Sequence, residues 1–319
     1  MALIASTAAA AFGTRPAAAA AKVRIASLKF GTVGWELDVI KTHGLDVKHG
    51  IDLEVIPISG KQSADVMLLG GETDAIVTDW IWVSRQRAGG QMLSFIPYST
   101  AVGALVAKKD GPVRSLADLK GRKIGVAGGP TDKSWVILRA YAKSRDGIDL
   151  ARDAEPVFAA PPLLNEAAEK GDIDALVNYW HFLAKLEPKG FAPILTVRDA
   201  AQGLGLDPAL PLIGYAFKDD FAKANPGAIE GLAKASAEAK QLLKTSDAEW
   251  ERLKPLMRVA NDAEFEALKA GFRAGIPSGV ATDEASAAKM FAFLAEVGGK
   301  DLTGEATSLQ PGTFWPLKP

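Results

Sequence analysis

Tryptophans at repeated positions are the feature of this sequence that points to a function, and that function is the binding of a ligand. The segment GETDAIVTDWIWVSR at 71–85 aligns without gaps on GDIDALVNYWHFLAK at 171–185. The same offset of 100 residues relates three aromatic pairs: Trp35 with Trp135, Trp80 with Trp180, and Trp82 with Phe182. This internal repeat predicts two similar halves. Aromatic rings facing each other across a shared slot would gain about 0.5 to 1.5 kcal/mol per stacked pair beyond burial.

The sequence around these tryptophans alternates between expected strands and expected helices. Strands are expected at 23–28, 51–58, 75–78, 91–96, 103–107, 123–127, 155–159 and 175–178, and helices at 34–43, 63–69, 115–119, 134–145, 164–170, 227–244, 248–258, 262–274 and 283–296. This pattern predicts an α/β protein with two lobes, each a mainly parallel sheet flanked by helices. Each paired tryptophan then follows a strand, at the edge where open α/β sheets bind ligands. Any one of them could fill a core instead, but Ile, Val and Leu already supply the core positions of these strands.

Cationic and polar side chains accompany the tryptophans at the same strand ends. Lys29 follows the first strand, and Lys61 and Lys133 lie where helices are expected to start. Free amides and the helix macrodipole attract anions there, and a neighbouring Lys strengthens the attraction, although a single Lys could equally be a solvated surface residue. The candidate ligand-binding residues are Trp35, Trp80, Trp82, Trp135, Trp180, Lys29, Lys61, Lys133, Thr131, Ser59, Thr78, Asn178 and His181. His181 is equally compatible with a structural role.

The sequence offers no arrangement typical of catalysis or of a metal site. It has no Cys and only three His, so thiolate nucleophiles and Cys-ligated metals are excluded. The stretch GGPTDKS at 128–134 lacks the Gly that a phosphate-binding loop needs before its Lys. Asp74 and Asp174 lie just before matched strands, which favours turn capping over acid–base chemistry. We therefore expect no catalytic residues, no catalytic cofactor and no metal.

Composition and charge narrow the class of partner. The 319 residues are 48% hydrophobic and carry a net charge of −1, so there is no global electrostatic attraction to nucleic acid. A chain of this length is expected to form two domains, and no later segment is apolar enough to span a membrane. Residues 1–21 combine an apolar stretch with an A-x-A-like end, which predicts a secretory signal peptide and a periplasmic, soluble mature protein.

At this point the sequence resembles the periplasmic substrate-binding proteins of ABC importers for sulfonates, nitrate and thiamine pyrimidine precursors. The matching pieces are SLADLKGRKIGVAGG at 115–129, GDIDALVNYW at 171–180 and IGYAFKDDFAKANPGAIEGLAKASAEA at 213–239. The resemblance implies a type II binding-protein fold with a two-stranded hinge. The expected division is a signal peptide at 1–21, lobe one at 22–99 and 211–319, and lobe two at 100–210.

The same resemblance implies a small ligand, an ABC permease and ATPase as partners, and a monomer. Because small sulfonates or nitrate need fewer aromatic walls, the five tryptophans favour a larger, planar, anionic ligand. Within the family the sequence most resembles members that bind pyrroloquinoline quinone, a planar tricarboxylated quinone. Three alternatives stay open: a sulfonate, nitrate or thiamine-precursor ligand; an enzyme on the same fold, as in thiamine pyrimidine synthesis; and an exported partner of a quinone dehydrogenase.

Overall fold

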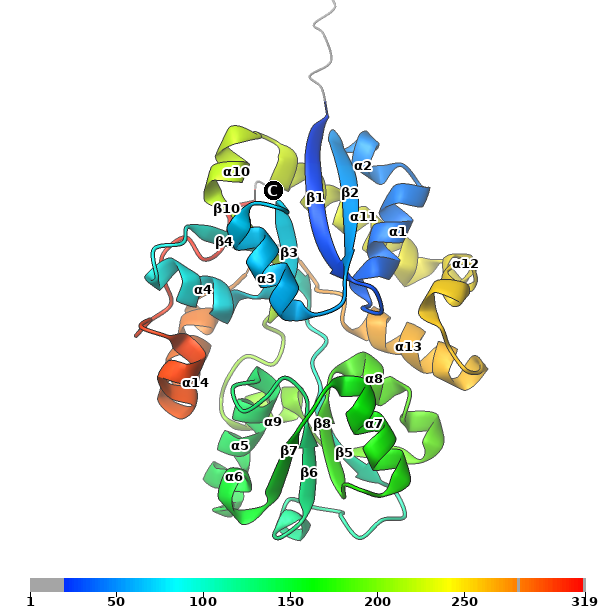
Figure 1. Cartoon of the computed structure of the whole chain (residues 1–319), viewed down its shortest axis with the longest axis vertical. Helices are drawn as coiled ribbons and strands as arrows, with labels where there is room; N and C mark the ends of the chain where they lie inside the picture. The colour runs from blue at the N-terminus through cyan, green and yellow to red at the C-terminus, as the bar shows by residue number, and fades with distance from the viewer. Residues whose placement is uncertain (1–19, 280–281, 318–319) are drawn as a thin grey trace, which may run out of the picture.

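The computed structural model describes residues 20–279 and 282–317, which form two lobes, one above the other in Figure 1. The upper lobe contains a five-stranded sheet in the order β2-β1-β3-β10-β4, and the lower lobe a five-stranded sheet in the order β7-β6-β8-β5-β9. The strands are β1 Ala21–Leu28, β2 Ile51–Ile58, β3 Ala75–Asp79, β4 Leu93–Ser99, β5 Ala104–Lys108, β6 Lys123–Val126, β7 Glu155–Phe158, β8 Ala175–Asn178, β9 Phe191–Thr196 and β10 Ile213–Lys218.

Within each sheet one strand runs against the other four. In the upper sheet β10 is antiparallel to β3 and β4, whereas β1 is parallel to β2 and β3. In the lower sheet β5 is antiparallel to β8 and β9, whereas β6 is parallel to β7 and β8. The two strand orders correspond position by position, with β3 matched to β8 and β10 to β5. The prediction of two similar, mainly parallel sheets is confirmed.

Helices cover the faces of both sheets. They are α1 Val33–Thr42, α2 Leu45–Lys48, α3 Lys61–Gly70, α4 Trp80–Ala88, α5 Lys133–Asp146, α6 Leu150–Asp153, α7 Pro161–Lys170, α8 Trp180–Ala184, α9 Val197–Gly203, α10 Asp219–Ala224, α11 Ala228–Thr245, α12 Asp247–Met257, α13 Asp262–Ala274 and α14 Glu284–Thr303. Among the described residues, the eight helices of ten residues or more lie close to the expected ranges, whereas most of the shorter helices fall where no helix was expected. The helix expected at 115–119 is only a 3₁₀ turn at Ala117–Leu119. The amphipathic pattern of α13 explains its packing, since Phe265, Leu268 and Phe272 recur at helical spacing and are buried together.

The chain passes between the two sheets twice, after β4 and again before β10. Two C-terminal helices then contact both lobes: α13 packs against α8, and α14 packs against both α4 and α5. One apolar cluster accordingly includes Val83 of α4, Leu138 of α5 and Phe291 of α14. The residue limits that the sequence suggests for the two lobes stay a prediction.

The matched acidic residues Asp74 and Asp174 hold strand starts in place. Asp74 accepts a hydrogen bond from the Arg24 backbone amide at 2.8 Å and pairs with its guanidinium. Asp174 accepts from the Lys123 amide at 3.0 Å and contacts Arg122. The prediction that these carboxylates are structural is confirmed.

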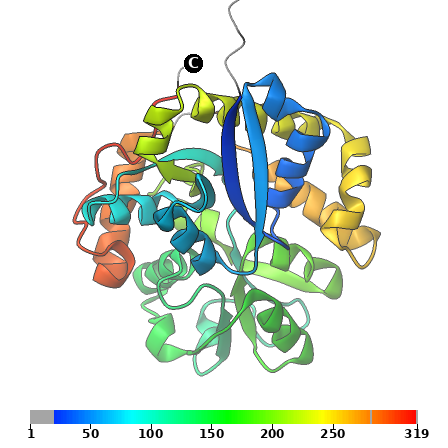
Figure 2. The same ribbon diagram turned by 45° about the horizontal axis from the view of Figure 1, so that its top comes forward.

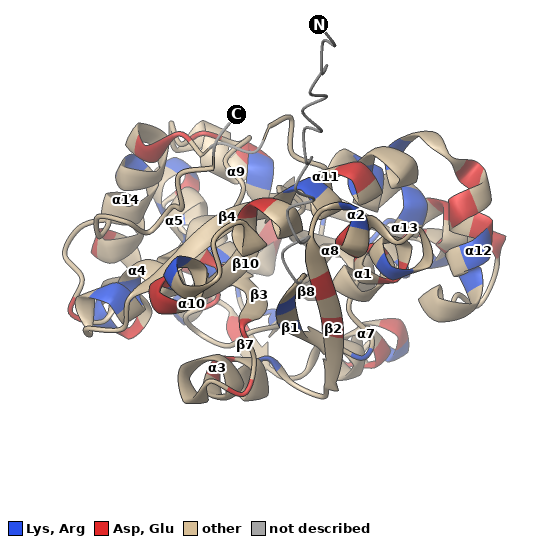
Figure 3. Cartoon of the chain, turned by 90° about the horizontal axis from the view of Figure 1, so that it is seen from above, with Lys and Arg blue, Asp and Glu red and all other residues tan. Residues whose placement is uncertain are grey.

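The surface carries charges of both signs. Figure 3 shows basic and acidic residues interspersed along helices such as α10, α12 and α13. Among the described residues, the search for a helix long and apolar enough to cross a membrane found none. The predicted signal peptide falls largely on residues 1–19, which lie outside the described residues.

Candidate functional site

A cleft of about 1070 Å³ lies between the two lobes. The loops after β1, β2 and β3 line it from one lobe, and the loops after β6, β7 and β8 line it from the other. In the tilted view of Figure 2, β1 and β2 point with their lower ends toward the green lower lobe. The carboxyl ends of both sheets therefore face one cleft, and the helices α1, α3 and α8 begin there without a side-chain cap on their backbone amides.

Aromatic side chains from both lobes line this cleft. Trp82 and Phe182, which the internal repeat relates, both contribute to the lining, and Phe30 and Tyr179 join them. Trp35 also lines the cleft but is only 6% exposed, because it packs edge-on against Trp250 at 5.9 Å between ring centroids. Aromatic side chains do line the cleft, but they are not all the ones that the sequence predicts.

Three of the five predicted tryptophans do not line this cleft, and that part of the prediction is wrong. Trp80 is fully buried, and its indole Nε1 donates to the Pro211 carbonyl at 3.1 Å. Trp135 is equally buried in the same apolar cluster. Because helical residues two apart point about 200° from each other, Trp80 faces the core where Trp82 faces the cleft.

Trp180 is the third exception. It packs edge-on against Trp35, with 6.4 Å between ring centroids, and its ring lies over Gly271 of α13. A Cβ atom at position 271 would lie 2.7 Å from that ring, so glycine is needed for this approach of the two lobes. Trp180 therefore closes the lobe contact behind the cleft.

Two predicted polar contacts are also turned away from the cleft. Thr78 is 2% exposed within β3 and does not belong to the cleft lining. Asn178 is 1% exposed, and its amide donates to Asn165 Oδ1 at 2.9 Å and to the Pro161 carbonyl at 3.0 Å. Its carbonyl oxygen accepts from the Tyr179 amide, so Asn178 fixes the loops of the lower lobe rather than a ligand.

The remaining predicted residues do come together along the cleft. Its lining includes Lys29, Ser59, Lys61, Thr131, Lys133 and His181. Lys29 is exposed and has no ion-pair partner among residues 20–279 and 282–317. Lys61 pairs with Asp65 at 3.1 Å and lies 5.6 Å from the centre of the Trp82 ring. Contact of these side chains with a ligand stays a prediction.

Lys133 is held by a carboxylate of the other lobe. Its Nζ donates to Asp79 Oδ2 at 2.8 Å, and both side chains are largely buried. Burial alone would raise the pKa of Asp79, but Lys133, Lys61 and the Trp82 amide together lower it. Burial would likewise lower the pKa of Lys133, but Asp79 and Asp132 raise it. Both groups are therefore charged near neutral pH.

His181 is uncharged near neutral pH. Burial, with a smaller contribution from Lys185, lowers its pKa to about 4. A neutral imidazole in the cleft wall can donate or accept one hydrogen bond without adding charge. It also supplies a ring face, since it lies 4.5 Å from the Phe182 ring centroid.

Comparison with known proteins identifies the family. The model of the family described as NMT1/THI5 like matches residues 39–248, which is more than half of the chain. The chain belongs to the NMT1/THI5-like family. Its fold is that of two-lobed periplasmic binding proteins of type II, as the sequence predicts.

Three solved structures illustrate the likeness in fold. The periplasmic aliphatic sulphonate-binding protein SsuA of Escherichia coli is 17% identical, with a TM-score of 0.75 over 93% of this chain and 92% of that one. The alkanesulfonate-binding protein SsuA of Xanthomonas axonopodis pv. citri, bound to MOPS, is 19% identical, with a TM-score of 0.71 over 94% and 99%. The periplasmic nitrate-binding protein NrtA of Synechocystis PCC 6803 is 15% identical, with a TM-score of 0.57 over 77% and 68%.

The cleft of this NMT1/THI5-like protein also holds three cations that were not among the predicted ligand-binding residues. Arg85 and Lys185 occupy matched positions of the repeat, and both line the cleft. Arg85 donates to the Asp301 carbonyl at 3.2 Å, and Lys185 donates to the Arg258 carbonyl at 3.4 Å. Their matched positions in the repeat could have predicted this, because equivalent positions of the two lobes face the same cleft.

Arg258 is a further missed residue, and no sequence pattern marks it. It follows α12, lines the cleft and lies over the Phe30 ring at 4.5 Å. Its φ of 52° is the left-handed conformation that a residue with a side chain rarely adopts. Such strain persists only where the surroundings hold it, and it often marks a functional site.

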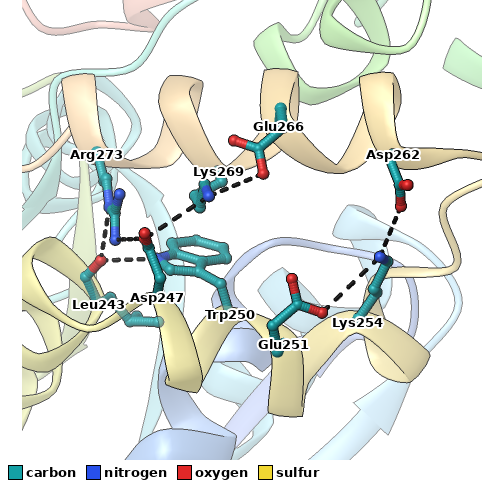
Figure 4. A network of polar contacts seen from close by, with 9 residues as sticks. All are labelled: Leu243, Asp247, Trp250, Glu251, Lys254, Asp262, Glu266, Lys269 and Arg273. Atoms are coloured by element: carbon teal, nitrogen blue, oxygen red, sulfur yellow. Dashed lines mark hydrogen bonds and ion pairs between the residues drawn. The ribbon is translucent and has the colours of Figure 1, made fainter.

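A network of polar contacts joins α11, α12 and α13, the helices next to Arg258 (Figure 4). Trp250 Nε1 and Arg273 Nε both donate to the Leu243 carbonyl, at 2.7 and 3.0 Å. Lys254 of α12 bonds Asp262 at the start of α13 at 2.7 Å, and Arg273 bonds Asp247 at 2.7 Å. Because α11, α12 and α13 are joined in this way, the loop that holds Arg258 has a rigid base.

A buried charged cluster supports the cleft from behind. Glu36, next to Trp35, is fully buried and pairs with Lys240 at 2.6 Å. The Tyr215 hydroxyl donates to Glu36 Oε1 at 2.9 Å, and Ser236 Oγ donates to it at 2.6 Å. Burial lowers the pKa of Lys240 although Glu36 opposes this. The cluster ties α1 to α11 and holds the backbone that carries Trp35.

Proposed function

We propose that this protein is the solute-binding component of an ABC importer and that it captures a bulky, planar organic anion between its lobes. The observation that carries the proposal is the cleft itself, which joins aromatic side chains, helix N-termini and cations from both lobes. Membership of a family whose fold relatives include sulphonate- and nitrate-binding proteins supports the transport role. We propose a periplasmic location for the same reason.

The charge of the lining supports an anionic ligand. Lys29, Arg85, Lys185 and Arg258 have no carboxylate within 4.0 Å among the described residues. These four cations lie on elements of both lobes. The lining has four carboxylates: Asp65 and Asp79 are each paired with a lysine, and Asp132 and Asp301 form no ion pair among the described residues. Basic side chains therefore outnumber acidic ones on the lining. A ligand with more than one carboxylate could therefore contact both lobes at once, with bidentate contacts to the two guanidinium groups.

The size of the cleft favours a ligand larger than nitrate. Pockets for drug-sized molecules measure about 300 to 1,000 Å³, and this cleft of about 1070 Å³ lies just above that range. The rings of Trp82 and Phe182 lie on the lining where they could stack on a planar guest. Pyrroloquinoline quinone combines a flat ring system with three carboxylates, and we propose it as the first ligand to test.

The proposal is tested by titrating the purified protein with pyrroloquinoline quinone while tryptophan fluorescence is recorded. Saturable quenching that nitrate and a short alkanesulfonate do not compete away would support a bulky planar anion. Saturable binding of the alkanesulfonate alone would replace the ligand but keep the transport role. Recovery of a chemically altered ligand after incubation would favour an enzyme and overturn the proposal.

A further inference from the structure

The ion pair between Asp79 and Lys133 connects the two lobes across the cleft. Asp79 ends β3 of the upper lobe, and Lys133 begins α5 of the lower lobe. The Nζ to Oδ2 distance is 2.8 Å, with 19% of the lysine side chain and 6% of the aspartate side chain exposed. A rotation that moves α4 away from α5 would separate these two atoms and break the pair.

Both partners are fixed to rigid elements. The second oxygen of Asp79 accepts from the Trp82 amide at 2.8 Å and so caps the start of α4. Asp132, directly before Lys133, caps α5 by accepting from the Ser134 and Trp135 amides. Each end of the pair is therefore tied to a helix start of its own lobe. A charge-assisted hydrogen bond in a water-poor contact is among the stronger polar interactions in proteins.

The pair is not a by-product of the internal repeat. Position 79 corresponds to Tyr179 in the other half, whose side chain does not cap the helix that follows it. The other lysine–aspartate pair of the cleft, Lys61 with Asp65, lies within α3 and does not cross between lobes. Among the described residues of the cleft lining, Asp79 is therefore the carboxylate whose ion pair links the two lobes.

We infer that Asp79 is a positioning residue, which holds the cleft closed through Lys133 and so lengthens the residence of any enclosed ligand. Only the effect on the residence time of a ligand rests on the proposed function. Loss of the pair should speed the release of chemically different ligands by a similar factor, because the pair stabilises the closed arrangement and not one ligand. A residue that touches the ligand would instead change the ranking of ligands.

The decisive experiment measures the distance between the lobes without any ligand. The sequence has no cysteine, so spin labels can be placed at Val66 in α3 and Leu163 in α7, both exposed and outside the cleft lining. Asp79→Asn removes the charge but keeps an oxygen that caps α4. Asp65→Asn is the matched control, since it breaks an ion pair of the same cleft within one lobe.

In the parent protein, double electron–electron resonance should show a population with a short distance between the labels at positions 66 and 163. In Asp79→Asn the ratio of short to long distances should fall at least tenfold, and in Asp65→Asn it should stay within twofold. Lys133→Gln breaks the pair from the other lobe and should reproduce Asp79→Asn, which guards against a folding defect of one variant. Equal distance distributions in the parent, Asp79→Asn and Lys133→Gln would overturn the inference.

Release rates provide a second readout. For pyrroloquinoline quinone or an alkanesulfonate, whichever binds, Asp79→Asn should raise the dissociation rate about tenfold and change the association rate little. An unchanged dissociation rate would contradict the inference even if the lobes open. Because the distance measurement needs no ligand, its failure is separate from a failure of the proposed ligand.

Discussion

Two tryptophans at the start of α4 should respond in opposite ways to truncation. Trp80 is fully buried against the sheet and bonds the Pro211 carbonyl, whereas Trp82 lines the cleft. Trp80→Ala removes the largest side chain of its surroundings, and deletions of this kind cost about 3 to 5 kcal/mol of the free energy of unfolding. The lost hydrogen bond leaves the Pro211 carbonyl without its partner and adds to the loss.

Trp82→Ala should lower the free energy of unfolding by about 1 to 2 kcal/mol, less than Trp80→Ala does, because Trp82 is partly exposed and packs only against the edge of the apolar cluster. Its structural contacts include the Lys61 ammonium at 5.6 Å, a cation–π contact worth about 0.5 to 1 kcal/mol at an exposed site. Loss of one stacked ring should weaken binding of a planar ligand by about 1 to 3 kcal/mol, or about 5- to 150-fold in Kd.

Urea denaturation measures the first quantity, and a fluorescence or calorimetric titration with pyrroloquinoline quinone measures the second. Trp80→Phe, which keeps part of the buried ring, is the variant to titrate if Trp80→Ala does not fold. It should bind like the parent. The reasoning is refuted if Trp82→Ala binds like the parent while Trp80→Phe loses affinity, or if both truncations destabilise the fold equally.

Three further variants test other parts of the account. Lys240→Met leaves Glu36 buried without its counter-ion and should cost about 3 to 5 kcal/mol in urea denaturation, and the double variant with Glu36→Gln should lose less. Because His181 has a pKa of about 4 in the folded state against about 6.5 unfolded, its contribution to stability is present above pH 6.5 and is lost as the pH falls toward 4. The free energy of unfolding of His181→Gln should therefore fall less than that of the parent between pH 6.5 and 4, by at most about 3 kcal/mol. An equal fall in the parent and the variant would contradict the burial of His181 as a neutral ring. Arg258→Gly relieves a left-handed backbone, so it should raise the free energy of unfolding by up to about 1 kcal/mol while weakening anion binding about tenfold or more; unchanged binding would remove Arg258 from the site.

The sequence predicts the fold well because the relevant signals are local or repeated. Apolar runs such as 51–58 and 175–178 are strands with the expected bounds, and the offset of 100 residues places β3 and β8 at matched positions of their sheets. The same repeat brings Trp82 and Phe182 to one cleft.

The composition of the site was harder to predict because a strand end does not show which way a side chain points. Trp80 and Trp82 share one strand end, yet the helix that begins at Trp80 turns them to opposite sides. Lys133 and Trp135 at the start of α5 divide in the same way between cleft and core. Arg258 follows α12 and lies 230 residues after the end of β1 at Leu28, and its approach depends on the packing of α11, α12 and α13.

Fluorine NMR of protein labelled with 5-fluorotryptophan tests the central claim most directly, with pyrroloquinoline quinone, an alkanesulfonate and nitrate added in turn. The resonances are assigned by replacing each tryptophan with phenylalanine. We predict that the ligand that binds shifts the Trp82 resonance most and leaves those of Trp80 and Trp135 in place. A bound ligand that leaves the Trp82 resonance unmoved would contradict a binding site between the lobes.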